Sequence, residues 1–138
     1  MEIFDNGILL AKHIPSKDLG ASGLTFHSLP EDGIQVGVWN YGEGQILQPH
    51  IHNLHQKVAN RTAEVLYVIK GSVHVDIYNE NSELLREFSA SVGDVVICLA
   101  GGHGYRILEE GTLVLEVKNG PYFGPEVDRR RIDQQCQS

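Results

Sequence analysis

The chain is built from short runs in which apolar and polar residues alternate. Three runs are especially regular, at residues 34–39, 72–78 and 113–118. Similar runs occupy residues 23–28, 45–52, 64–70, 83–90, 94–99 and 103–108. Alternation with period two is typical of a β-strand that buries one face, and no long stretch has the three-and-four spacing of an amphipathic helix. The pattern therefore predicts an all-β chain of about nine short strands, folded as a sandwich or barrel.

The connections between these strands are rich in turn-forming residues. Such residues recur in the segments 30–33, 41–44, 79–82 and 109–111. They allow tight reversals of the chain. Residues 53–63 differ because they are polar and lack a period, and we expect them to form a loop at one mouth of the barrel. No repeat or linker is present, so we expect a single domain, with the barrel at about 23–118 and a tail at about 120–138.

Length and charge narrow the possible functions. With 138 residues the chain has room for one domain with its own core. Its net charge of −7 argues against binding to nucleic acid, whose phosphates it would repel. The one basic run, Arg129 to Arg131, is flanked by Asp128 and Asp133, and we interpret it as a solvated part of the tail.

Cysteine usage and the N-terminus bear on the compartment. Two cysteines, Cys98 and Cys136, are too few for a disulfide framework and fit a reducing environment. The N-terminal residues lack a positive segment, and their only apolar run, at residues 8–11, is too short for a signal peptide or a membrane span. We therefore expect a cytoplasmic protein that binds neither nucleic acid nor membranes.

Histidines carry the clearest chemical signal. Three of the seven, His50, His52 and His55, fall within six positions. On a strand, residues i and i+2 point to one face with Cα atoms about 6.6 Å apart, so His50 and His52 can converge on one ion. His55 would join them only if the strand ended at His52 and the loop folded back. The isolated histidines are interpreted as polar surface residues: His13, His27 and His74.

The spacing around these histidines resembles the first motif of the cupin superfamily. That motif runs glycine, five residues, His-x-His, a spacer, glutamate, six residues and glycine. Here Gly44 is followed by five residues and then by His50 and His52. Glu64 is followed by six residues and then by Gly71. The spacer holds eleven residues where three or four are common, and the additional residues fall in the expected loop.

A second stretch is similar to the other cupin motif, which runs glycine, five residues, Pro-x-Gly, two residues and histidine. Gly93 is followed by five residues, then by Leu99, one residue and Gly101, with His103 after them. Leucine replaces the proline, the last interval is one residue shorter, and Ile107 stands where asparagine is usual. The glycines around His103 can absorb the shortening, because glycine reaches backbone angles that other residues avoid.

The resemblance implies a small antiparallel β-barrel, or jelly roll, that binds one divalent transition metal ion. The residues that match the family's ligands are His50, His52, Glu64 and His103, with His55 as the alternate ligand. Imidazole and carboxylate ligands suit Fe, Mn, Ni, Co, Cu or Zn. Glu64 shares a strand face with Leu66 and Val68, although alternation alone does not decide which face points inward. A metal would offset the cost of burying its carboxylate.

Residues in phase with the expected ligands are candidates for a substrate pocket. Gln48 shares the face of the paired histidines, and Tyr105 shares that of His103 if its strand is straight. Either could orient a ligand histidine or contact substrate, and no catalytic residue is assigned. Cys98 is interpreted as a buried small hydrophobe, because no basic partner is evident near it.

Three classes of function remain open, and fold alone does not separate them. The first, which we favour, is a metal-dependent enzyme that isomerises, epimerises or cleaves a small oxygen-rich molecule such as a sugar or sugar acid. The second is an iron-dependent dioxygenase, and the third is a non-catalytic module in which a metal helps to bind a small ligand. The ending at residues 116–122 also resembles small stand-alone cupin metalloproteins, several of which are linked to bacterial surface-polysaccharide genes. Because cupins of this size commonly pair, we expect a homodimer.

Overall fold

In the computed structural model, which describes residues 1–132, the chain is almost entirely β-structure, with 43% strand and 5% helix. Cys136, Asp133 and the end of the expected tail lie outside the described residues. The elements in chain order are β1 (Glu2–Asp5), β2 (Ile8–Ile14), a 3-10 turn (Ser16–Asp18), β3 (Gly23–Phe26), β4 (Gly37–Asn40), β5 (Glu64–Lys70), β6 (Ser72–Tyr78), β7 (Leu84–Ser91), β8 (Val95–Cys98), β9 (Gly102–Ile107), β10 (Leu113–Lys118) and α1 (Pro125–Asp128).

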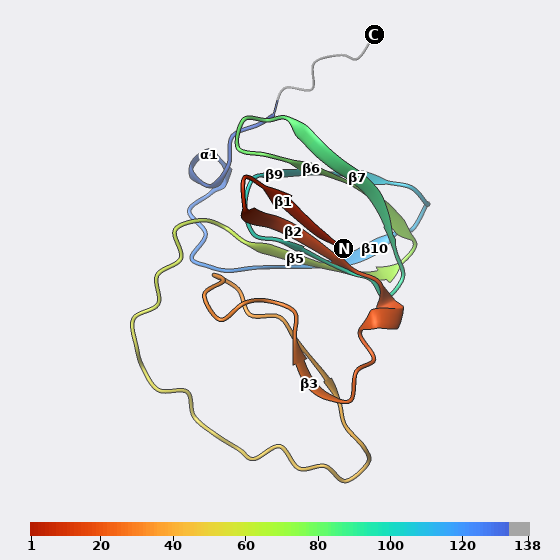
Figure 1. The fold of residues 1–138 in the computed structure, drawn as a ribbon, viewed down its shortest axis with the longest axis vertical. Helices are drawn as coiled ribbons and strands as arrows, with labels where there is room; N and C mark the ends of the chain where they lie inside the picture. The colour runs from red at the N-terminus through yellow and green to blue at the C-terminus, as the bar shows by residue number, and fades with distance from the viewer. Residues whose placement is uncertain (133–138) are drawn as a thin grey trace.

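Two antiparallel sheets face each other, and a hairpin adds a further layer (Figure 1). The larger sheet has five strands in the order β1-β2-β8-β5-β10, and the smaller has three in the order β7-β6-β9. The hairpin pairs β3 with β4. Within residues 1–132 none of the sheets closes on itself, so this part of the chain is an open sandwich and the expected closed barrel is not observed.

The main core lies between the two sheets. Strand β6 contributes Val73, Val75 and Ile77, each at most 1% exposed, from every second position. The larger sheet contributes the facing side chains of Leu10, Leu66, Val68 and Val96. Full burial of an aliphatic side chain of this size contributes about 1.5–3 kcal/mol relative to leaving it in water. In β6 the apolar positions of the alternation are therefore the buried face.

The hairpin region covers the outer face of the larger sheet. Val95 and Ile97 of β8 alternate with the core-facing residues of that strand and belong to a second apolar cluster. Ile34 and Val36, which precede β4, pack against this cluster. All four residues of β8 are consequently buried, as expected for an unbroken apolar strand that is covered on both faces.

Most of the predicted strands are present. Strands β5, β6 and β10 begin and end at the predicted residues, and β3, β4, β7, β8 and β9 overlap their predictions. The alternation does not predict β1 and β2, which form one edge of the larger sheet outside the expected barrel range of 23–118. The prediction of a strand at 45–52 is wrong for this structure, because these residues have no secondary structure.

The segment without a strand belongs to a long exposed loop. Every residue from Asn40 to Arg61 is exposed, and Figure 1 shows this loop sweeping away from the sheets. Within the described chain, β9 pairs only with β6 and β10 pairs only with β5. His103 of β9 lies against Glu64 of β5, so the free edges of β9 and β10 fall on the same side of the sandwich.

The chain after β10 is tied back to the start of β5. The side-chain oxygen of Asn119 accepts a hydrogen bond from the Ala63 amide at 2.8 Å, and its Nδ2 donates to the Arg61 carbonyl oxygen at 3.2 Å. A four-residue helix, α1, then begins at Pro125. No helix within residues 1–132 is long and apolar enough to cross a membrane.

Candidate functional site

Glu64 begins β5 and points into the sandwich. The following residues on the same face, Leu66 and Val68, belong to the core, and Glu64 itself is only 6% exposed. In the sheet it lies opposite Cys98 of β8 on one side and Lys118 of β10 on the other. The buried face of this strand is therefore the face that carries the carboxylate.

Cationic groups hold the Glu64 carboxylate from two directions. His103, the second residue of β9 in the opposite sheet, places its Nε2 2.9 Å from Glu64 Oε2. Lys118 Nζ lies 2.7 Å from Glu64 Oε1 and 2.7 Å from Glu116 Oε1. Both oxygens of the carboxylate therefore have partners, which offsets the cost of removing its charge from water.

These contacts shift the protonation equilibria of the group. Burial raises the pKa of Glu64, but hydrogen bonds from His103 and Lys118 outweigh it and bring the pKa down to about 2. Burial lowers the pKa of His103, but Cys98 and Glu64 outweigh it and raise the pKa to about 10. The carboxylates of Glu116 and Glu64 raise the pKa of Lys118. At neutral pH the group is therefore an ionised network.

The network lines a hollow of about 880 Å³ at one end of the sandwich. The ring of Tyr105 lies 5.2 Å from that of His103, and its hydroxyl is 3.6 Å from Cys98 Sγ. The expected shared face of His103 and Tyr105 is confirmed, and so is the burial of Cys98. Sites for small molecules typically have volumes of about 300–1,000 Å³, so the hollow has the size of such a site.

The structure does not bring the remaining predicted ligands to this pair. His50 and His52 lie in the exposed loop with their rings 4.8 Å apart, and neither lines the hollow. His50 Nδ1 instead lies 3.1 Å from the carbonyl oxygen of Gln48, the other pocket candidate, which is itself exposed. The alternate ligand, His55, makes a similar local contact with Asn53. Of the four predicted ligands, two are assembled, and the metal-binding role of the set stays a prediction.

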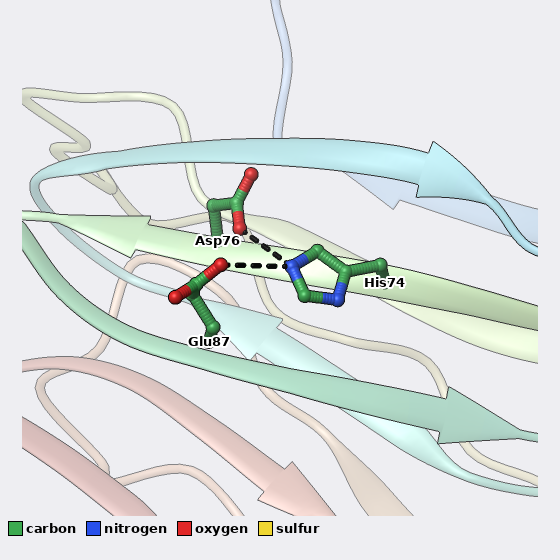
Figure 2. A group of neighbouring side chains, drawn as sticks. All are labelled: His74, Asp76 and Glu87. Atoms are coloured by element: carbon green, nitrogen blue, oxygen red, sulfur yellow. Dashed lines mark hydrogen bonds and ion pairs between the residues drawn. The ribbon is translucent and has the colours of Figure 1, made fainter. Parts of the chain in front are cut away.

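A different cluster comes closer to the geometry of an ion site. Within residues 1–132, one group of three such side chains has ligand atoms that all lie within 4.8 Å of one another: His74, Asp76 and Glu87. Figure 2 shows them on β6 and β7, with His74 Nε2 2.9 Å from Asp76 Oδ1 and 3.3 Å from Glu87 Oε1. Both carboxylates meet the same imidazole nitrogen, and the Glu87 side chain is 57% exposed. We interpret the cluster as a hydrogen-bonded surface group.

His13 is also engaged with a carboxylate. Its Nε2 lies 2.9 Å from Asp94 Oδ2, and Asp94 accepts further hydrogen bonds from the backbone amides of Ser16 and Ser91. The side chains of His13 and His74 are 13% and 18% exposed, so both are partners of carboxylates and are less exposed than the sequence indicated.

Two residues of the network, Glu116 and Lys118, are missed by the sequence reasoning. Both lie on β10, where alternation is regular but does not show which face meets the core. Their role becomes visible only through the register of β10 against β5, which sets Lys118 opposite Glu64 and Glu116 opposite Leu66. A lysine at the end of a predicted strand does not by itself indicate a functional role for Lys118.

Comparisons with known proteins add no further constraint on the site. No protein-family model, curated protein or solved structure matches the chain.

Proposed function

We propose that the chain is a cupin-like, metal-dependent enzyme that isomerises, epimerises or cleaves a small oxygen-rich molecule in the hollow beside Glu64 and His103. One observation carries this proposal. A carboxylate and an imidazole from facing sheets converge to 2.9 Å inside a hollow of small-molecule size. The order of the strands within the two open sheets also suits a jelly roll in which one further strand remains to be added to β9.

The Glu64–His103 pair fits two neighbouring ligands of one ion. Ligand atoms about 2.1 Å from an octahedral metal lie about 3.0 Å apart when they are adjacent. The observed separation of Nε2 and Oε2 is 2.9 Å. Lys118 competes for the same carboxylate, but it has a second partner in Glu116 and can keep that contact when an ion takes Glu64. A divalent ion would place a larger charge beside Glu64 than the ammonium group does.

His50 and His52 would complete the ligand set if the loop docked on the sandwich. Residues 45–52 have the alternation of a strand but no strand partner in the described chain, and β9 has a free edge beside His103. Pairing there would turn both histidines to one face and give the exposed backbone of this segment hydrogen-bond partners. The eleven residues between His52 and Glu64 can extend to about 36 Å.

The residues around the pair are suited to proton transfer. A bound ion would supply a Lewis acid that polarises a substrate oxygen. Tyr105, Lys118 and Glu116 line the hollow and provide a phenol, a cation and a carboxylate near the pair. Such groups favour a reaction in which a proton moves on the substrate, as in an isomerase, epimerase or lyase, over oxygen chemistry.

The metal content of the purified protein tests the site. Purified without an affinity tag and reloaded with each of the six candidate metals in turn, the parent should bind about one equivalent of at least one of them, measured by plasma mass spectrometry. Glu64→Ala and His50→Ala should reduce the bound metal to traces. His74→Ala, which removes a histidine from the surface cluster, is the matched control and should leave it unchanged. A parent without near-stoichiometric metal would contradict the metal site.

The reaction class is tested on the metal-loaded protein. A panel of sugars and sugar acids is followed by proton NMR in deuterated water, where exchange of a carbon-bound proton is expected. Oxygen uptake with bound iron would instead identify a dioxygenase. Tight binding of a panel member without turnover would identify a binding module. Either of these two results would replace the proposed reaction class.

A further inference from the structure

Basic side chains gather around the hollow. Its lining includes Arg61, Lys118, Arg129, Arg130 and Arg131, which are 5 of the 11 lysines and arginines in the chain. The chain as a whole carries a net charge of −7. A molecule that is negative overall and basic at one opening repels anions elsewhere and admits them there.

The acidic residues of the same lining are already engaged. Glu64 and Glu116 bind Lys118, and Glu80 binds Arg61, whereas Asp128 accepts a hydrogen bond from the neutral hydroxyl of Thr62 and keeps its charge. These contacts use the charge of Lys118 and Arg61 as well. The basic character that remains at the rim therefore comes from the run at residues 129–131.

The basic run is held against the hollow. Arg130 Nη2 donates to the Glu80 carbonyl oxygen at 2.7 Å, and its Nη1 lies 3.5 Å from Ser82 Oγ. Ile132 packs so closely on β9 that a Cβ atom added at Gly102 would lie 2.5 Å from its Cδ1. The run is exposed, as the sequence indicated, but it is held against the turn between β6 and β7 and the start of β9.

Arg130 acts as the anchor, and its two neighbours remain for a ligand. Arg129 and Arg131 line the same hollow as Arg130, and both are exposed. Within residues 1–132 neither has a carboxylate at ion-pair distance.

We propose that Arg129 and Arg131 bind a phosphate or carboxylate group of the molecule that occupies the hollow. This step rests on the proposed function for the location of the site and adds the substrate class, a small oxygen-rich molecule that carries an anionic group. Guanidinium groups bind both kinds of anion through two parallel hydrogen bonds. The rest of the molecule then extends toward Glu64 and His103, which line the same hollow.

Calorimetric titration of the full chain with inorganic pyrophosphate and with malonate at low ionic strength tests this assignment. The parent should bind at least one of the two anions, and a preference between them distinguishes phosphate from carboxylate recognition. The double variant Arg129→Ala, Arg131→Ala should bind at least about tenfold more weakly, which corresponds to about 1.4 kcal/mol. Arg106→Ala is the matched control, because it removes an exposed charge from β9 at a position that does not line the hollow.

Equal affinity in the parent and the double variant would overturn the assignment, and so would an equal loss in Arg106→Ala or no binding of either anion to the parent. If the double variant does not fold, the single variants Arg129→Gln and Arg131→Gln replace it, and each is expected to weaken anion binding a few-fold.

Metal content is measured on the same samples. If the parent binds an anion through the two arginines but holds no metal, the proposed function is contradicted and this inference is not. If the parent holds metal but binds no anion through the arginines, this inference is contradicted and the proposed function is not.

Discussion

Two His–carboxylate groups involve the same small sheet but lie in different surroundings. His103 of β9 meets Glu64 of the other sheet inside the sandwich, where the Glu64 side chain is 8% exposed. His74 of β6 lies 2.9 Å from Asp76, whose side chain is 17% exposed, and 3.3 Å from Glu87, whose side chain is 57% exposed. The shortest distance between a histidine nitrogen and a carboxylate oxygen is 2.9 Å in both groups, so this distance does not distinguish them.

The Glu64–His103 contact and the His74–Glu87 contact differ in how far water reaches them, and this changes what each contact contributes. The Glu64 carboxylate is shielded from water and has two cationic partners, which bring its pKa down to about 2, and it opens into a hollow that can take a ligand. An exposed ion pair is screened by water and typically contributes less than about 1 kcal/mol. A short His–carboxylate distance alone is therefore weak evidence for a functional site, and burial, further charged groups and adjoining space are what distinguish one.

The largest expected effect is on stability. Glu64→Gln leaves the positive charges of His103 and Lys118 facing each other without their shared anion, and we expect the free energy of unfolding to fall by about 3 kcal/mol. Glu87→Gln, the matched change in the surface cluster, should cost less than about 1 kcal/mol. Urea denaturation of both variants measures the difference. Equal losses would remove the distinction between the two regions.

A third pair, His13 and Asp94, calibrates the comparison because Asp94 is buried without lining the hollow. Replacing Asp94 with alanine leaves the amides of Ser16 and Ser91 without their acceptor. We expect the free energy of unfolding at pH 7 to fall by about 2 kcal/mol. Thermal unfolding with and without the substitution measures it, and a loss below about 0.5 kcal/mol would show that burial of a carboxylate pair is not what governs its contribution.

The same pair gives a pH dependence whose sign is fixed. Burial raises the pKa of Asp94, but the Ser91 amide, the His13 imidazole and the Ser16 amide outweigh it and hold the pKa below its usual value of 3.8. Because the pKa is lower in the folded state, the stabilisation is present above pH 3.8 and is lost as the pH falls through the folded-state value. The stability difference between parent and Asp94→Ala should therefore shrink below pH 3.8. A difference that grows on acidification would contradict the assignment.

A smaller effect is expected at the surface cluster. His74→Ala removes the imidazole shared by Asp76 and Glu87, and we expect a change of about 0.5 kcal/mol in the free energy of unfolding. Binding of zinc by the purified parent and variant is compared by calorimetry. Loss of a tight zinc equivalent in His74→Ala would break the comparison, because it would make the surface cluster a metal site.

The smallest effect concerns the rim of the hollow. Gly102→Ala places a methyl group 2.5 Å from Ile132 Cδ1, so the end of that side chain must move and loosen its contact with β9, without backbone strain at residue 102. We expect pyrophosphate affinity to fall a few-fold while bound metal is unchanged. Unaltered affinity would show that the position of Ile132 does not set the position of the arginines.

Alternation predicted most of the strands because most of them bury one face more fully than the other. It placed β5, β6 and β10 at their observed ends, and it identified the run that contains β8. It did not predict β2, because the apolar run at residues 8–11 is continuous and lacks a period, and it did not predict β1, which has only four residues. It predicted a strand at 45–52 that the structure does not contain. Alternation alone is not sufficient there, because a strand also needs a neighbouring strand to pair with its backbone hydrogen-bonding groups.

The site could be predicted only in part for a related reason. Motif spacing identified Glu64 and His103, which the fold brings together from different sheets. The partners Lys118 and Glu116 depend on strand register, and the placement of Arg129 to Arg131 depends on contacts of the chain after β10. Both are long-range features that a local pattern does not contain.

The most direct measurement is anomalous X-ray diffraction from crystals grown with the metal that the protein binds. We expect a single strong peak in the hollow, within about 2.1 Å of Glu64 and His103, with His50 and His52 brought to the same ion. A peak at His74, Asp76 and Glu87, or a hollow without a peak in crystals of the metal-loaded protein, would contradict the assignment of Glu64 and His103 as the metal centre.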